Sequence, residues 1–206
     1  MEAFETSVRR GGTAALREAS RFFMQDDAVY QSLRDIARRL DEIAVPYAIV
    51  GGMALVAHGY RRTTEDVDIL VTADGVGRIH QSLVGLGYVP LFPGSRHLRD
   101  TRTGVRIEWV IAGQYPGDGK PKPVAFPDPQ SVAVEIDGIR YVNLPKLVEL
   151  KLASGMTNPG RLRDLADVQE LIRALRFAPD FALQLHDSVR AEFQRLAQGI
   201  VDGAQS

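Results

Sequence analysis

The segment Gly51-Gly-Met-Ala-Leu-Val-Ala-His-Gly-Tyr-Arg-Arg-Thr-Thr-Glu-Asp-Val-Asp-Ile-Leu-Val71 combines a glycine pair with two closely spaced carboxylates. The apolar run at 47–50 before it predicts a buried strand, and 53–58 predicts a short helix. Residues 67–71 predict a second strand. Because successive side chains of a strand point to opposite faces, Asp66 and Asp68 are expected on the same face.

Two carboxylates held this close raise the cost of ionising each other, and a cation between them removes that cost. Oxygen ligands in a chain with 0 Cys indicate a hard ion, Mg²⁺ or Mn²⁺. The alternative for Asp66 and Asp68 is a pair of acidic side chains at a solvated strand end.

Gly51 and Gly52 follow the first predicted strand directly and precede the short helix. The backbone N–H groups of such a turn can approach a phosphate at a helix N-terminus. The alternative is a tight strand-to-helix turn, and the Lys-Ser/Thr pair of a Walker A loop is missing. Taken together, the glycine pair and the carboxylate pair indicate chemistry on a nucleoside triphosphate.

The order strand, Gly-Gly, helix and Arg-Thr-Thr-Glu-Asp-Val-Asp at 62–68 resembles the nucleotidyltransferase superfamily with the DNA polymerase β-like fold. The chain is most similar to the small bacterial branch of AbiEii-type toxins and minimal or antibiotic-modifying nucleotidyltransferases. The resemblance spans roughly residues 30–175. It implies metal binding by the two carboxylates and nucleotide binding by Gly51, Gly52, Arg62 and Thr64. Many members carry Ser where this chain has Gly52.

The resemblance also implies a third carboxylate on a later strand, and Glu108 in the predicted strand 105–111 is the candidate. Glu108 would complete the metal site and accept a proton from the acceptor hydroxyl as general base. The family more often has Asp at this place. The alternative is a surface Glu paired with Arg106 or Arg140.

Lys151 falls inside the apolar stripe of a helix predicted at 144–154, where an unpartnered Lys is rare. Its ammonium would reach the triphosphate and neutralise developing charge. The alternative is a Lys that extends to solvent or forms a structural ion pair. Similar toxin-like proteins carry such a Lys followed by R-D-x-x-D.

Asp164 projects onto the apolar face of a helix predicted at 162–175, and Asp167 lies at the edge of that face. Asp164 would orient Lys151 or assist the acceptor hydroxyl. The alternative is a charge near a helix N-terminus that the helix dipole stabilises by about 0.3–1 kcal/mol.

Composition limits the class of protein. The 206 residues include 25 Lys+Arg, 26 Asp+Glu and 45% apolar residues, which excludes a wholly disordered chain and argues against broad electrostatic capture of nucleic acid. The absence of Cys agrees with a reducing compartment, and no signal-peptide or membrane-spanning run is present, so we expect a cytoplasmic protein without a membrane partner. One segment, 94–122, is positive and suits either RNA contact or a solvated loop.

The expected fold class is α/β (α+β), with a mixed β-sheet flanked by helices and a helical C-terminal part. Asp137-Gly138 between β-prone runs predicts a type I′ hairpin, which makes a purely parallel sheet unfavourable. Residues 1–143 would form the nucleotidyltransferase-like core with its N-terminal helices, and 144–206 a helical region packed on it. Further helices are predicted at 14–24, 28–44, 75–86 and 180–198, a strand at 88–92, and an irregular proline-rich connection at 112–130.

The resulting hypothesis is a metal-dependent enzyme that moves a nucleoside monophosphate from an NTP to a hydroxyl. The acceptor could be a tRNA end, as for the toxin of a toxin–antitoxin pair with a cognate antitoxin, or a small molecule such as an antibiotic. The alternative is a non-catalytic, degenerate nucleotidyltransferase fold that serves as a binding module or antitoxin, which Gly52 and Glu108 support as departures from the family pattern.

Overall fold

The computed structural model describes residues 27–60 and 62–203, which form a mixed sheet with strand order β3-β4-β5-β2-β1-β7-β6. Strands β1 and β7 pair in parallel, as do β2 and β5, and the other neighbouring strands are antiparallel. The mixed sheet predicted from the sequence is therefore confirmed. The strands are β1 (Tyr47–Ile49), β2 (Asp66–Val71), β3 (Tyr88–Pro90), β4 (Leu98–Asp100), β5 (Arg106–Ile111), β6 (Ala133–Ile136) and β7 (Ile139–Val142).

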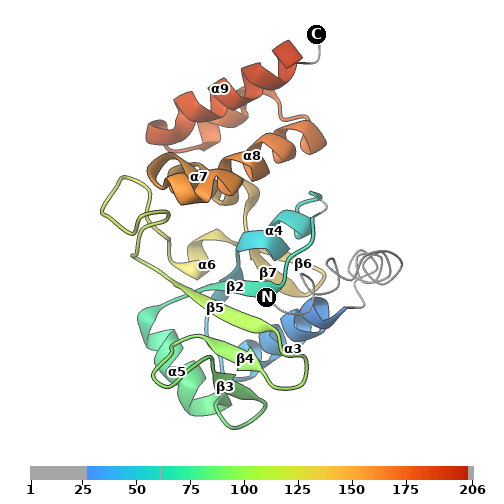
Figure 1. The fold of residues 1–206 in the computed structure, drawn as a ribbon, viewed down its shortest axis with the longest axis vertical. Helices are drawn as coiled ribbons and strands as arrows, with labels where there is room; N and C mark the ends of the chain where they lie inside the picture. The colour runs from blue at the N-terminus through green and yellow to red at the C-terminus, as the bar shows by residue number, and fades with distance from the viewer. Residues whose placement is uncertain (1–26, 61, 204–206) are drawn as a thin grey trace.

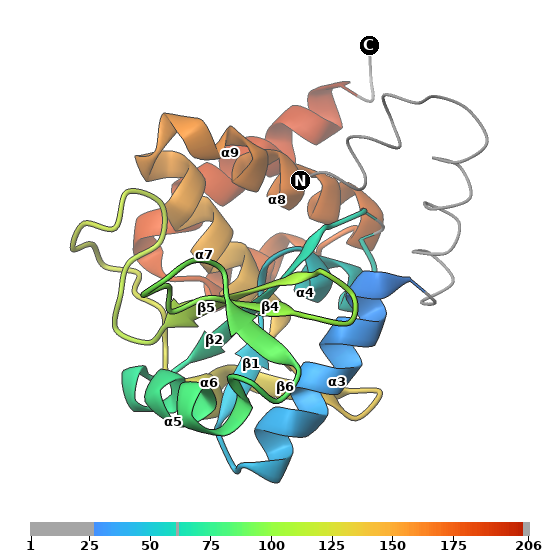
Figure 2. The same cartoon turned by 60° about the horizontal axis from the view of Figure 1, so that its bottom comes forward.

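Helices cover the sheet and extend beyond it. In Figure 1, α7, α8 and α9 lie together at one end of the molecule, α4 lies between them and the sheet, and α3 and α5 lie at the other end. Figure 2 shows the same separation after rotation. The helices are α3 (Ala28–Glu42), α4 (Gly51–Ala57), α5 (Ala73–Leu83), α6 (Pro129–Val132), α7 (Leu144–Thr157), α8 (Leu162–Leu175) and α9 (Asp187–Gly203), with 3₁₀ turns η1 (Pro159–Arg161) and η2 (Pro179–Gln184).

The core follows from residue periodicity. Strand β5 alternates half-buried and buried side chains, and β2 does the same until its last residues, which are all buried. Helix α3 buries Leu33, Ile36 and Leu40 completely at spacings of three and four. Its first turn is capped by Asp27, whose side chain accepts a hydrogen bond from the backbone N–H of Tyr30.

The β6–β7 hairpin has the turn that its sequence predicts. Asp137 and Gly138 have φ values of 51° and 75°, and Ile136 pairs with Ile139 across the two-residue loop. Positive φ at both turn positions is the signature of type I′.

Some local predictions were wrong. Helix α4 begins at Gly51, two residues earlier than expected, and α5 ends at Leu83. The helix predicted at 180–198 is split into η2 and α9, because the backbone N–H of His186 donates to Glu149 Oε2 while the His186 ring accepts from the Ser188 N–H. The helix predicted at 14–24 lies outside the described residues.

The C-terminal helices contact one another and the core. Helix α7 packs against α8 and α9 and also against α4. The division at 143/144 stays a prediction. No helix in the described part of the chain combines the length and apolar character needed to cross a bilayer.

Candidate active site

A cavity of about 720 Å³ lies where α4, β2 and β5 face α7, η1 and α8. All nine residues proposed from the sequence line it, so the fold brings together positions up to 113 residues apart (164 − 51). These are Gly51, Gly52, Arg62, Thr64, Asp66, Asp68, Glu108, Lys151 and Asp164, joined by Thr63, Glu65, Arg106, Gly160, Arg161, Arg163 and Asp167.

Parallel pairing of β2 with β5 builds the carboxylate cluster. The register places Asp66 opposite Arg106 and Asp68 opposite Glu108, so these side chains emerge on one face. Oxygen atoms of Asp66, Asp68 and Glu108 all lie within 4.8 Å of one another. Three convergent carboxylate oxygens fit a hard divalent cation, and the expected common face of the two aspartates is observed.

Without a bound cation, ionising all three carboxylates of this cluster is unfavourable. Burial, followed by the charges of Asp66 and Glu108, raises the pKa of Asp68 to about 7, although Lys151 and Arg161 act in the opposite direction. A cation among the oxygens would favour the ionised form, which is the form that binds metal.

Arg106 lies beside the same cluster. Its Nη2 is 3.4 Å from Asp66 Oδ2 and its Nη1 is 3.8 Å from Glu108 Oε1. Glu108 therefore belongs to the carboxylate cluster and also contacts Arg106, one of the two partners considered in its surface alternative. The other partner, Arg140, pairs with Asp41.

The two glycines allow side chains to approach the main chain. Gly51 has φ +61°, and a Cβ there would lie 1.9 Å from Asp68 Oδ2. A Cβ at Gly52 would lie 2.7 Å from Thr64 Oγ1, which itself donates to Asp66 Oδ1 at 2.9 Å. The space that a Ser side chain would need at position 52 is thus filled by Thr64, which accounts for glycine at this position.

Lys151 joins α7 to α8 through two carboxylates. Its Nζ lies 2.8 Å from Asp164 Oδ1 and 2.7 Å from Asp167 Oδ2. Arg62 donates to both oxygens of Asp167, at 2.8 and 2.6 Å, and Ser154 Oγ donates to Asp164. Burial would raise the pKa of Asp164, but the charge and hydrogen bond of Lys151 lower it overall. The ion pair considered as the alternative for Lys151 is therefore present, and contact with a triphosphate stays a prediction.

The sequence interpretation missed several members of the cleft. Asp167 is 4% exposed at the centre of the ion-pair network rather than at the edge of a helix face. Its spacing of three from Asp164 was the available signal, since residues so spaced share a face. Arg163 is the Arg of the R-D-x-x-D motif, whereas Arg161 gave no signal, because it ends a Pro-Gly turn before α8 and interrupts no apolar pattern.

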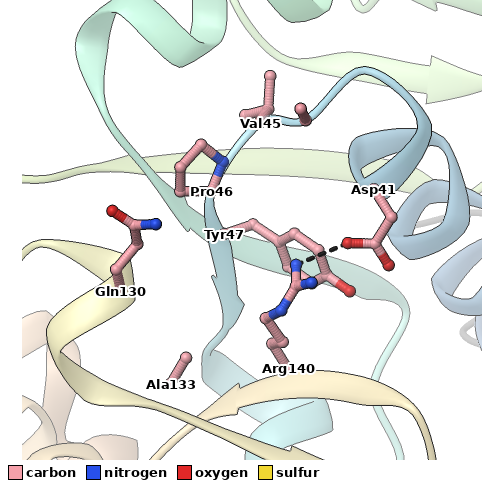
Figure 3. A pocket seen from close by; sticks show the side chains of 8 residues that line it. Asp41, Val45, Pro46, Tyr47, Gln130, Ala133 and Arg140 are labelled. Carbon is pink, nitrogen blue, oxygen red and sulfur yellow. Dashed lines mark hydrogen bonds and ion pairs between the residues drawn. The ribbon is translucent and has the colours of Figure 1, made fainter.

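A second cavity, of about 370 Å³, lies at the opposite end of β1 (Figure 3). Arg140 Nη1 pairs with Asp41 Oδ1 at 2.6 Å, and the guanidinium lies 5.2 Å from the centroid of the Tyr47 ring. None of the residues proposed from the sequence lines this cavity.

Two solved structures share the fold of this chain. The structure of ANT(2″)-Ia in complex with adenylyl-2″-tobramycin aligns with a TM-score of 0.53 and 16% identity, covering 80% of this chain and 96% of that chain. An antigenic nucleotidyltransferase-like protein from Paracoccidioides brasiliensis aligns with a TM-score of 0.50 and 18% identity, covering 84% and 87%. At these identities the likeness establishes the fold.

The family follows from the sequence comparison. Residues 13–204 match the model of a family described as "uncharacterised nucleotidyltransferase", and the chain belongs to this family. The protein is thus a nucleotidyltransferase. Comparison with curated protein sequences gives no match.

Proposed function

We propose that the protein transfers a nucleoside monophosphate from an NTP to an acceptor hydroxyl with the help of a divalent cation. The observation that carries the proposal is the convergence of Asp66, Asp68 and Glu108 oxygens within 4.8 Å. The Gly51 main chain lies directly against this cluster.

In the proposed reaction the acceptor oxygen forms a bond to the α-phosphorus, and the bond to the bridging oxygen of the β-phosphate breaks, releasing pyrophosphate. Mg²⁺ or Mn²⁺ held by the three carboxylates would neutralise charge on the phosphates and lower the pKa of the acceptor hydroxyl. Glu108, whose side chain is 35% exposed, can receive the acceptor proton from the open side of the cleft.

The other cleft residues are proposed to bind and position the nucleotide. Backbone N–H groups at Gly51 and Gly52 would contact phosphate oxygens, and the Thr64 hydroxyl would do so by turning away from Asp66, to which it donates in this structure. The network containing Arg62, Lys151 and Asp164 forms the facing wall, and Asp164 holds Lys151 there.

For the acceptor we propose a hydroxylated small molecule or a tRNA end. The fold shared with a protein crystallised with adenylyl-2″-tobramycin supports the first. The resemblance to AbiEii-type toxins supports the second, together with a cognate antitoxin as partner. The alternative of a non-catalytic binding module rested on Gly52 and Glu108 as departures from the family pattern. The first no longer supports it, because the Thr64 side chain fills the space that a larger residue at position 52 would need.

Labelled NTPs, Mg²⁺ and either cellular RNA or a pool of small hydroxylated molecules test the proposal. We expect label to enter one pool, and Asp68→Asn to reduce the transfer at least about a hundredfold. Asp74→Asn, the same change at an exposed position of α5, should have no effect. Transfer that survives in both Asp66→Asn and Asp68→Asn, or no transfer to either pool, would contradict the proposal.

A further inference from the structure

The cleft contains cations of two kinds. Three are paired with carboxylates: Arg62 with Asp167, Lys151 with Asp164 and Asp167, and Arg106 with Asp66 and Glu108. Arg161 and Arg163 also line the cleft, and among the described residues neither forms an ion pair. Their charges are therefore the ones not already neutralised by carboxylates.

Arg161 is the last residue of η1 and lines the cleft that holds the carboxylate cluster. Against the effect of burial, Lys151 and to a smaller extent Arg161 lower the pKa of Asp164 on the facing wall of the cleft. Arg163 lies in the first turn of α8, and its charge partly offsets the rise in the pKa of Tyr60 that burial and Asp167 cause.

Hydrogen bonds to Asn158 hold the η1 turn that carries Arg161 in place. Asn158 caps η1: its Oδ1 accepts from the Gly160 N–H at 2.9 Å, and its carbonyl accepts from the Arg161 N–H at 2.8 Å. The Asn158 Nδ2 in turn donates to the carbonyl of Gly117 at 3.2 Å. Arg161 is thus attached to a fixed backbone although its side chain is exposed.

The proline-rich connection at 112–130 contacts this turn and stabilises it. Lys122 Nζ donates to the Pro116 carbonyl at 2.5 Å and to Thr157 Oγ1 at 2.9 Å, and it pairs with Asp118. Gly117 has φ +77°, and a Cβ there would lie 2.4 Å from Thr157 Oγ1. The Lys122 ammonium is therefore occupied by groups of the protein itself. Through these contacts the connection at 112–130 fixes the C-terminal end of α7 and the start of η1.

We infer that Arg161 binds the polyphosphate tail of the NTP, and that Lys151 is a positioning residue that holds α8 against α7. This inference rests on the proposed function. A guanidinium is always charged and can donate two parallel hydrogen bonds to one phosphate, which suits an exposed cation that has no carboxylate to satisfy. If Lys151 turned to the phosphates instead, Asp164 would lose its cationic partner inside the protein.

The test compares binding of ATP and of inorganic tripolyphosphate, both with Mg²⁺, by calorimetry on the full chain. Arg161→Ala should weaken both about tenfold to hundredfold, the effect expected for loss of a charged hydrogen bond. Arg161→Lys should be intermediate, because it keeps the charge and loses the bidentate geometry. Arg173→Ala, at an exposed ion pair in the last turn of α8, is the control and should change neither dissociation constant more than about twofold.

The outcomes separate failure of this inference from failure of the proposed function. Equal binding by wild type and Arg161→Ala would overturn the role of Arg161 and leave the proposed transfer standing. Failure of the wild type to bind either ligand would overturn both. Asn158→Ala should weaken tripolyphosphate binding less than Arg161→Ala does, provided that its melting temperature shows the variant to be folded. Unchanged binding would show that Asn158 is not needed to hold the turn that positions Arg161.

Discussion

At Gly51 one backbone position decides whether the carboxylate cluster can form. The main chain has φ +61° and leaves no room for a Cβ beside Asp68. We expect Gly51→Ala to cost at least about 1–2 kcal/mol from the left-handed conformation alone and to displace the Asp68 carboxylate. Calorimetric titration with Mn²⁺ should show loss of binding.

Gly77 provides the matched control. It lies inside α5 without a positive φ, and a Cβ added there would have no other atom within 4 Å. Gly77→Ala should be neutral or stabilise the protein by up to about 1 kcal/mol, with Mn²⁺ affinity unchanged. Equal Mn²⁺ affinity in Gly51→Ala would show that Asp68 does not need this approach.

Asp68 should make stability depend on pH. Burial and the neighbouring carboxylates raise its pKa from 3.8 to about 7. Unfolding restores the ordinary value, so between about pH 4 and pH 7 the folded chain binds more protons than the unfolded chain. The contribution of Asp68 to the free energy of unfolding therefore falls as the pH rises through this window. Above about pH 7 the full cost of ionising this buried carboxylate lowers the free energy of unfolding.

Denaturant titrations in EDTA at pH 5 and pH 8 measure this effect. Between these pH values the wild type should lose about 1–3 kcal/mol more than Asp68→Asn, which has no proton to release. Mn²⁺ at pH 8 should recover stability in the wild type and not in the variant. Parallel pH profiles for the two proteins would contradict the assignment.

At the scale of elements, one buried network sets the contact between α7 and α8. Gly155 allows the helices to approach closely, since a Cβ there would lie 2.5 Å from Leu165 Cγ. Lys151, 8% exposed, joins the two helices from α7 to Asp164 and Asp167. Removing one partner of a buried ion pair leaves an uncompensated charge.

We therefore expect Lys151→Met to lower the free energy of unfolding by about 3–5 kcal/mol. Arg38→Met, which breaks the exposed pair with Glu42 on α3, should cost less than about 1 kcal/mol. Urea titrations measure both. If Lys151→Met proved as mild as Arg38→Met, Lys151 would not be the structural link between the helices.

The sequence predicted the elements whose pattern is local. Alternation in β2 and β5, the apolar face of α3 and the Asp137-Gly138 turn all depend on neighbouring residues, and each is present. Strand β4 was not predicted, because its three residues gain their hydrogen bonds only from β3 and β5. Local spacing places Asp167 on the same helix face as Asp164, but its pairing with Arg62 depends on how α8 packs across the cleft, which no local pattern predicts.

For the whole molecule, the question is whether residues 144–206 unfold as a separate unit. The Arg62–Asp167 pair is largely buried and joins the segment before β2 to α8, while α7 contacts α4. Such links across the cleft favour a single cooperative transition. The chain has one Trp, at position 109 in the sheet core, so its fluorescence reports on the sheet alone, whereas far-ultraviolet circular dichroism also reports on the C-terminal helices.

The variant Phe193→Ala tests whether the C-terminal helices and the sheet unfold together. Phe193 is 3% exposed on α9, and its ring centroid lies 5.4 Å from that of Phe181 and 6.0 Å from that of Phe177. Its truncation should cost about 3–5 kcal/mol. Because we expect one cooperative unit, the urea midpoint seen by Trp109 fluorescence should fall as far as the midpoint seen by circular dichroism, although the substitution lies outside the sheet. A circular dichroism midpoint that falls while the Trp109 midpoint stays in place would instead show that the C-terminal helices are a separate domain, with the cleft lying across a mobile interface.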